Sequence, residues 1–155
     1  MDTDKIRLTV YPAIAVHDQT FDDDTFVISI ASPEMSYANI QCKNVWKVSF
    51  HDVQQEYFLE KGERTIRPLD YELAQHIVRV AFENRDKRHW IIHCEAGISR
   101  SPAVALGLAK HIRFSKTVKG LEREFPHYNK YVRKLIEQAG DEQMKRVMKD
   151  LIRGE

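Results

Sequence analysis

The chain has little cysteine and no long apolar run. Its 155 residues include two cysteines, Cys42 and Cys94, too few for the disulfide framework of a small secreted domain, so both thiols are expected to be reduced. The longest apolar runs, such as VISIA and WII, are far shorter than a membrane span, and the start MDTDKIRLTV leads with acidic side chains. We therefore expect a cytoplasmic protein without membrane association.

Charge of either sign is not in excess. The formal net charge is +1, with 30% charged and 43% hydrophobic residues, which fits a folded chain and offers no bulk attraction for nucleic acid. No internal repeat, low-complexity tract or Gly/Ser linker divides the sequence, so residues 1–155 are expected to form one domain, acting as a monomer. Any preference for an anion must then arise from a local site.

The hydrophobic pattern predicts an α/β fold. Short runs rich in β-branched and aromatic residues predict strands at 6–11, 13–17, 25–31, 45–50 and 89–93. TFVISIA is apolar at nearly every position, as in a strand covered on both faces. Helices are predicted after Pro68, with Asp70 as N-cap, over 101–112, and along the charged tail, whose charges indicate solvated faces. We expect a central, mostly parallel sheet of four to five strands flanked by helices on both faces.

The stretch HCEAGISRS, residues 93–101, connects the last predicted strand to the helix at 101–112. Backbone N–H groups of such a loop point into one concavity, and the positive end of the helix dipole lies behind them. Gly97 permits backbone angles that a side chain would forbid, while Ala96 and Ser99 keep the rim small. The loop is therefore predicted to be an anion cradle of phosphate size.

Four side chains around this loop have the chemistry of a nucleophilic site. Arg100 presents a planar fork of donors that can hold two oxygens, and the loop N–H groups can stabilise a Cys94 thiolate as nucleophile. Ser101 can donate a hydrogen bond to the sulfur and make it a better leaving group. His93 is placed to orient the loop from behind.

His93, Cys94, five intervening residues, Arg100 and Ser101 resemble the signature of the cysteine-dependent protein tyrosine phosphatases. The short chain is most similar to the small atypical dual-specificity branch, over roughly residues 25–137. The resemblance implies a phosphatase fold and a phosphocysteine intermediate without metal or other cofactor. It also implies that phosphoryl oxygens are held by Arg100 and the loop amides of Glu95, Ala96, Gly97, Ile98 and Ser99. Expected substrates are phosphorylated proteins or small phosphomonoesters, phosphotyrosine first, then phosphoserine and phosphothreonine.

The resemblance also implies an aspartic acid that protonates the leaving group, on a loop after the strand that precedes the long connecting helix. Asp52, just past the predicted strand 45–50, is the first candidate, and Asp70 is the competitor, although its N-cap position already explains it. Other candidates remain open: Glu56, Asp18, Asp22, Asp23 and Asp24, His51 as the titrating group in place of a carboxyl, or no acid at all. Asn129 resembles the asparagine that braces the loop in this family, with a plain helix N-cap as the alternative.

Several rival interpretations remain. The cradle can belong to a phosphate-binding module with little turnover, or to a phosphatase acting on a phosphoinositide or an RNA 5′-phosphate, although Glu95 disfavours polyanions. A non-functional loop would place Arg100 in a surface ion pair. A metal site built from His89, His93 and Cys94 lacks a fourth ligand. Oxidation of Cys94 can be resolved by Cys42 only if the two sulfurs lie close together.

Overall fold

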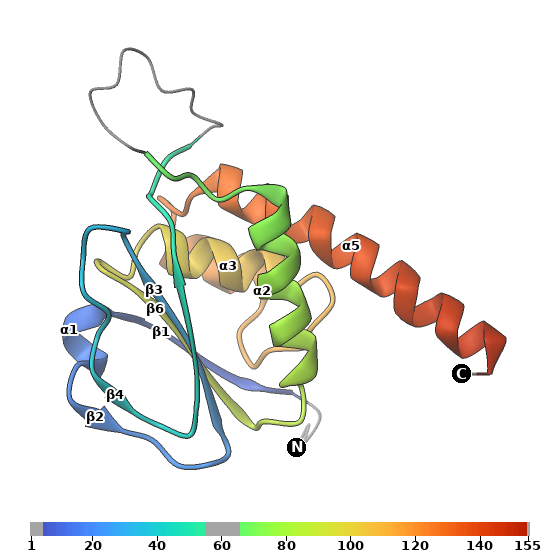
Figure 1. The fold of residues 1–155 in the computed structure, drawn as a ribbon, viewed down its shortest axis with the longest axis horizontal. Helices are drawn as coiled ribbons and strands as arrows, with labels where there is room; N and C mark the ends of the chain where they lie inside the picture. Colours follow the sequence, from blue (N-terminus) through green and yellow to red (C-terminus); the bar gives the residue numbers. More distant parts are fainter. Residues whose placement is uncertain (1–4, 55–65, 155) are drawn as a thin grey trace.

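The computed structural model describes residues 5–54 and 66–154 and has a parallel β-sheet at its centre (Figure 1). Its four strands lie in the order β1, β6, β3, β5, and every neighbouring pair is parallel. Their bounds are Arg7–Pro12 for β1, His89–Cys94 for β6, Thr25–Ala31 for β3 and Asn44–Ser49 for β5. The α/β class and the parallel sheet of four strands are therefore confirmed. A separate pair joins β2, Gln19–Thr20, to β4, Ile40–Gln41.

The helices cover the two faces of the sheet unequally. One face of the sheet, called the first face, packs in a single hydrophobic cluster with the four longer helices. These helices are α2 at Tyr71–Glu83, α3 at Arg100–Leu108, α4 at Val118–Glu124 and α5 at Lys130–Arg153. The second face packs Val27 and Ile91 under Val16 of the four-residue helix α1, Ala13–Val16, with Ile40 of β4 alongside. Helices on both faces were expected; among residues 5–54 and 66–154 the second face carries the single turn of α1, and the β3–β5 connection forms β4 beside it.

Central strand β3 is buried at all seven positions, as its apolar sequence predicts. Phe26 points to the face that the longer helices cover, where its ring meets Trp90 edge-on at 4.9 Å; Trp90 in turn meets Phe114 at 5.5 Å. Val27 points to the opposite face. The aromatic group therefore anchors the two central strands, β3 and β6, against the main core.

Two predicted elements differ from the structure. Residues 13–17 were expected to be a strand, but Ala13–Val16 form α1, because Pro12 ends β1 and the Ala13 N–H donates to the Glu95 carbonyl at 3.0 Å. The helix expected over 101–112 ends at Leu108, and the chain turns there, with the His111 and Ile112 N–H groups both donating to the Leu108 carbonyl. Asp70 caps α2 as predicted, accepting from the Leu73 N–H at 2.8 Å.

Helix α3 lies between the sheet and α5, and all nine of its residues are buried. Its small residues permit this close packing: a Cβ on Gly107 would lie only 2.5 Å from Cβ of Ile136 in α5. The contacts of α3 with the sheet and with α5 therefore fix the position of the helix, including its N-terminus. In the described part of the chain no helix has both the length and the apolar composition to cross a membrane.

Candidate active site

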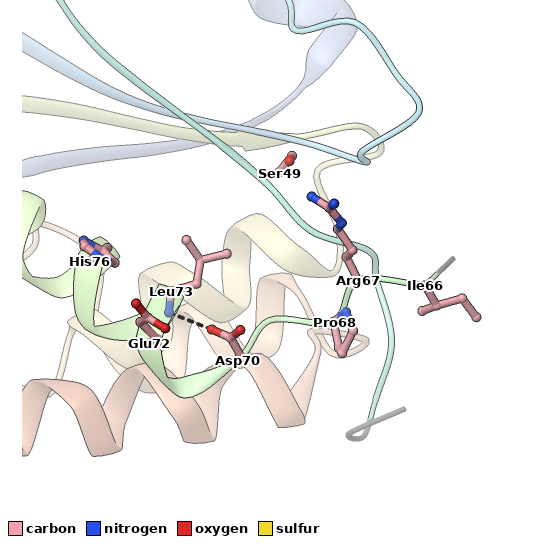
Figure 2. A pocket seen from close by; sticks show the side chains of 8 residues that line it. All are labelled: Ser49, Ile66, Arg67, Pro68, Asp70, Glu72, Leu73 and His76. Carbon is pink, nitrogen blue, oxygen red and sulfur yellow. Dashed lines mark hydrogen bonds between the residues drawn. The ribbon is translucent and has the colours of Figure 1, made fainter. Parts of the chain in front are cut away.

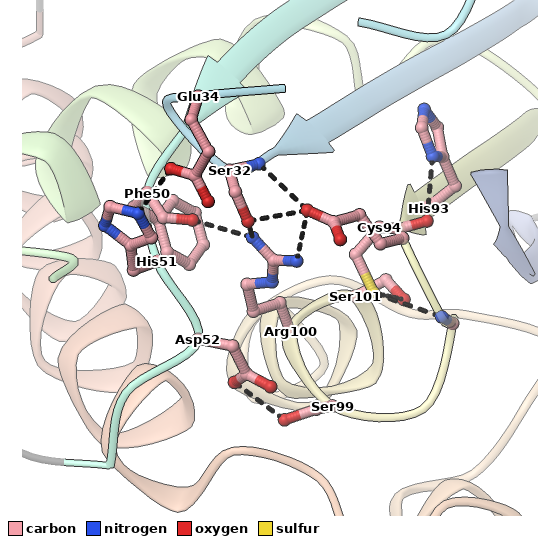
Figure 3. A network of polar contacts seen from close by, with 12 residues as sticks. Ser32, Glu34, Phe50, His51, Asp52, His93, Cys94, Ser99, Arg100 and Ser101 are labelled. Atoms are coloured by element: carbon pink, nitrogen blue, oxygen red, sulfur yellow. Dashed lines mark hydrogen bonds and ion pairs between the residues drawn. The ribbon is translucent and has the colours of Figure 1, made fainter. Parts of the chain in front are cut away.

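The predicted cradle lies at the edge where the carboxyl ends of all four strands meet. Strand β6 follows β5 in the sequence but lies between β1 and β3, so the strand order reverses beside it. In open α/β sheets ligands bind at such a reversal, outside the carboxyl ends of the strands. Residues 95–99 connect β6 to α3 at this point, and segments following β3 and β5 supply further polar groups (Figure 3).

Cys94, whose sulfur lies at the base of the loop, is buried, with 2% of the residue exposed. The sulfur accepts a hydrogen bond from the Gly97 N–H at 3.3 Å and lies 3.1 Å from the Ser101 hydroxyl. Gly97 has φ +72°, and a Cβ there would lie 2.6 Å from the Pro12 nitrogen. Only glycine therefore lets the loop turn its N–H toward the sulfur while it packs on the end of β1.

His93 supports the loop from the second face of the sheet. Its Nδ1 lies 3.3 Å from the Cys94 carbonyl and its Nε2 2.6 Å from the Ser29 hydroxyl. Because a carbonyl can only accept, Nδ1 donates and Nε2 accepts from Ser29. Burial lowers the pKa of His93, which keeps this neutral tautomer. The ring therefore holds the end of β6 to β3.

Arg100 is buried rather than part of a surface ion pair, and its guanidinium turns back toward the ends of β3 and β5 (Figure 3). Nη1 donates to the Ser32 hydroxyl at 3.0 Å and to the Phe50 carbonyl at 2.7 Å. Nη2 lies 3.2 Å from Oε1 of Glu95. The guanidinium is therefore fixed to three segments of the same edge.

Glu95 turns its side chain toward Ser32 and Arg100. Its Oε1 accepts from the Ser32 hydroxyl at 2.6 Å and from the Ser32 N–H at 3.3 Å. The hydrogen bond from Ser32, followed by the Arg100 guanidinium, lowers the pKa of Glu95, although partial burial acts to raise it. The carboxylate therefore stays ionised beside the arginine.

The predicted acid Asp52 lies at the opposite side of the loop. Its Oδ1 accepts from the Ser99 hydroxyl at 2.8 Å and from Asn129 Nδ2 at 2.7 Å. Asn129 is the N-cap of α5, since its Oδ1 accepts from the Val132 N–H. Its Nδ2 also donates to the Val53 carbonyl, so the side chain holds the segment after β5, while the Asn129 backbone N–H donates to the Ser99 carbonyl of the cradle loop at 3.1 Å. The structure thus brings Asp52 to the cradle through residues of the loop and of α5.

The competitor Asp70 belongs to a different cavity. A pocket of about 530 Å³ lies between the end of β5, the segment before α2 and the first turns of α2 (Figure 2). It is lined by Ser49, Ile66, Arg67, Pro68, Asp70, Glu72, Leu73 and His76. None of the cradle residues lines it, and the Asp70 carboxylate is engaged as the α2 cap. Asp70 therefore has a structural role.

The remaining acid candidates are also engaged away from the sulfur or outside the described residues. His51 turns to Glu34, with Nε2 2.7 Å from the carboxylate, and its Nδ1 accepts from the Arg67 N–H at 2.8 Å. Asp18 accepts from Asn39. Residues 22–24 precede β3 and therefore lie at the amino edge of the sheet, opposite the loop. Glu56 lies outside the described residues.

His89 and Cys42 lie far from the loop. His89 starts β6, and its nitrogens contact Arg7 and Thr9, both at 3.1 Å, so it does not converge with the cysteine that ends the same strand. Within residues 5–54 and 66–154, no three His, Cys, Asp or Glu side chains are grouped as metal ligands. The Cys42 sulfur lies 3.4 Å from the Thr25 carbonyl at the start of β3, about 20 Å of strand from the cradle. A Cys42–Cys94 disulfide does not fit this arrangement.

Sequence reasoning missed the residues that hold the arginine and the histidine. Ser32 follows β3 directly, the Phe50 carbonyl follows β5, and Ser29 is the one hydroxyl in the middle of an apolar strand. The two serines could have been found from one signal, a polar residue inside or just after a buried parallel strand. The carboxyl ends of parallel strands meet at one edge of the sheet, so such residues are candidates for a site at that edge. No side-chain pattern identifies a backbone carbonyl.

Comparison of the chain with protein-family models, with curated proteins and with solved structures gave no match. Function therefore has to be inferred from the chemistry of the residues themselves.

Proposed function

We propose that the chain hydrolyses phosphomonoesters through a phosphocysteine intermediate on Cys94. The observation that carries this proposal is the buried sulfur, within hydrogen-bonding distance of the Gly97 N–H and the Ser101 hydroxyl, at the N-terminus of α3. A structural cysteine in an apolar core has no need of such donors, whereas a thiolate is stabilised by them.

In the first step the sulfur lone pair attacks phosphorus, an S–P bond forms, and the P–O bond to the leaving group breaks. Arg100 and the loop N–H groups hold the three other phosphoryl oxygens as charge develops. Asp52 gives its proton to the leaving oxygen. Both hydrogen bonds described for Asp52 go to Oδ1, which leaves Oδ2 to carry this proton.

In the second step water attacks the phosphocysteine. Asp52, now a carboxylate, takes a proton from the water, the S–P bond breaks, and the thiolate leaves with a hydrogen bond from Ser101. The products are an alcohol and inorganic phosphate, and both Cys94 and Asp52 return to their initial states. No metal or other cofactor enters this reaction.

Phosphotyrosine in a protein, or a small aryl phosphate, is the proposed substrate, with phosphoserine and phosphothreonine next. Ile98, 54% exposed on the loop, offers an apolar surface beside the cradle to an aromatic ring. The nearby carboxylate of Glu95 disfavours polyanions such as phosphoinositides. A cytoplasmic location and a monomeric state are proposed with it, because the reaction needs a reduced thiol and involves one chain.

Hydrolysis of p-nitrophenyl phosphate tests the proposal. Wild-type protein should release p-nitrophenolate, and Cys94→Ser should lower turnover by at least roughly 10⁴-fold, since the nucleophile is lost. Cys42→Ser is the matched control and should retain wild-type activity. Acid quenching with radiolabelled substrate should trap phosphate on the wild-type chain and on Cys42→Ser, but not on Cys94→Ser.

Two outcomes would count against the enzyme. Release of phosphate by Cys94→Ser at the wild-type rate would remove Cys94 as the nucleophile. A wild-type protein that binds inorganic phosphate in titration calorimetry but hydrolyses no aryl phosphate would instead be a phosphate-binding module.

A further inference from the structure

We propose that Glu95 and Ser32 are positioning residues that aim the Arg100 guanidinium at the bound phosphoryl group. The proposal rests on the function proposed above, since it takes a phosphoryl group as the anion in the cradle. It assigns a role to a loop carboxylate, which would otherwise only repel that anion.

The three side chains form a closed ring of two hydrogen bonds and one ion pair. Arg100 Nη1 donates to the Ser32 hydroxyl at 3.0 Å, and this hydroxyl donates to Glu95 Oε1 at 2.6 Å. The ring closes where the same Oε1 lies 3.2 Å from Arg100 Nη2. Each member therefore restricts the other two, and the guanidinium plane has one preferred orientation.

This ring is anchored to the sheet. Ser32 follows β3 and is buried, and its backbone N–H adds a second hydrogen bond to Glu95. The Glu95 carbonyl accepts from the Ala13 N–H after β1, and the Phe50 carbonyl after β5 holds Arg100 Nη1. The orientation of the guanidinium is therefore set by contacts at the ends of three strands and not by the flexible aliphatic part of the Arg100 side chain.

The orientation leaves one edge of the guanidinium for a ligand. An arginine has five N–H donors, and the contacts to Ser32, Phe50 and Glu95 use both of Nη1 and one of Nη2. The Nε–H and the second Nη2–H therefore lie outside this ring of described residues. These two donors share the side edge of the fork, which matches two oxygens of a phosphoryl group.

Electrostatics alone would make Glu95 unfavourable. An ionised carboxylate next to the nucleophile repels a phosphate dianion. The structure turns the Glu95 carboxylate away, to the end of the guanidinium that faces β3 and β5. Glu95 therefore has two separate effects, since it positions the Arg100 guanidinium and repels the phosphate dianion. Two neutral substitutions of Glu95 can distinguish these effects.

Glu95→Gln and Glu95→Ala carry the same charge, but only Gln keeps an acceptor oxygen for Ser32 and Arg100. We expect inorganic phosphate, measured by titration calorimetry, to bind about tenfold more tightly to Glu95→Gln than to Glu95→Ala, the size of one charge-assisted hydrogen bond. The same ratio is expected in kcat/KM for p-nitrophenyl phosphate. Glu142→Gln, an exposed carboxylate on α5, is the control and should match wild type.

Ser32 supplies an independent test. Ser32→Ala keeps the charge of Glu95 but opens the ring, and should weaken phosphate binding about tenfold, whereas Ser32→Thr keeps the hydroxyl and should restore most of the affinity. Thermal melting of each variant separates positioning from folding, because a purely structural role lowers Tm without changing the phosphate Kd of the folded protein.

Equal phosphate Kd values for Glu95→Gln and Glu95→Ala would overturn the positioning role, and so would equal values for Ser32→Ala and Ser32→Thr. Failure of the proposed function looks different. A wild-type protein without turnover, whose variants still differ in phosphate Kd as expected, would retain the positioning role and lose the enzyme.

Discussion

The N-termini of the longer helices differ in one respect that bears on function. At α2, α4 and α5 a side chain at the N-cap accepts from the backbone N–H of the third helical residue: Asp70 from Leu73 at 2.8 Å, Thr117 from Gly120 at 3.0 Å, and Asn129 from Val132 at 3.0 Å. At α3 the N-cap residue Ser99 makes no such bond, and its hydroxyl donates to Asp52 instead.

The sequence contains the reason for this difference. The third residue of α3 is Pro102, which has no N–H, so a Ser99 cap of this type has nothing to accept from. The Ser99 hydroxyl is therefore released for the carboxylate of the proposed acid. Three helix starts are capped by their own N-cap side chains, whereas the N-cap side chain of α3 bonds Asp52 and leaves the start of α3 open, where we propose that the anion binds.

Loss of the arginine fork should have the largest effect on this open helix start. Arg100→Lys keeps a positive charge but cannot offer two parallel donors to a phosphoryl group. We expect kcat/KM for p-nitrophenyl phosphate to fall by about 10³-fold. Phosphate binding should weaken in parallel. Wild-type kinetics in this variant would show that the helix terminus and loop amides hold the anion without the fork.

Loss of the proton donor should discriminate between substrates. Asp52→Asn keeps the hydrogen bonds to Ser99 and Asn129 possible but removes the proton, so an alkyl phosphate with a poor leaving group should be hydrolysed about 10²-fold more slowly. Hydrolysis of p-nitrophenyl phosphate should fall by less than about tenfold. An equal loss for both substrates would mean that Asp52 supports the loop and that the acid is another group.

Restoring a conventional cap at α3 should have a smaller effect. Pro102→Ala returns an N–H to the third helical residue, and the Ser99 hydroxyl can then turn toward it and release Asp52. We expect alkyl phosphate turnover to fall about threefold, with aryl phosphate turnover nearly unchanged. If the alkyl-to-aryl ratio of rates stays at its wild-type value, the proline is not what frees Ser99.

Removing a closed cap should affect stability alone. Asp70→Ala deletes the hydrogen bond to the Leu73 N–H and should lower the free energy of unfolding by about 1 kcal/mol, measured by urea denaturation. Activity should not change, because Asp70 lines the pocket of Figure 2 rather than the cradle. A loss of turnover that depends on the leaving group would return Asp70 to the role of proton donor.

Short-range features of the site could be predicted, because neighbours in the sequence are neighbours in the loop. Cys94, Gly97, Arg100 and Ser101 all lie on one strand–loop–helix unit, and their contacts at 3.1 and 3.3 Å involve residues three to seven apart. Residues 13–17 were mispredicted because an apolar run of that length fits a strand or a buried turn of helix equally well. Only the contact of Ala13 with Glu95 decides between them.

The sequence alone determined the α/β class, the parallel central strand, the cap of α2 and the loop at residues 93–101, because these depend on local pattern and on backbone chemistry. The tertiary structure decided the partners of Asp52, which lie 47 and 77 positions away in the sequence, and two partners of Arg100, Phe50 and Ser32, which lie 50 and 68 positions away. It did so through the strand order, since inserting β6 between β1 and β3 brings distant carboxyl ends to one edge. Residue spacing carries no record of that order.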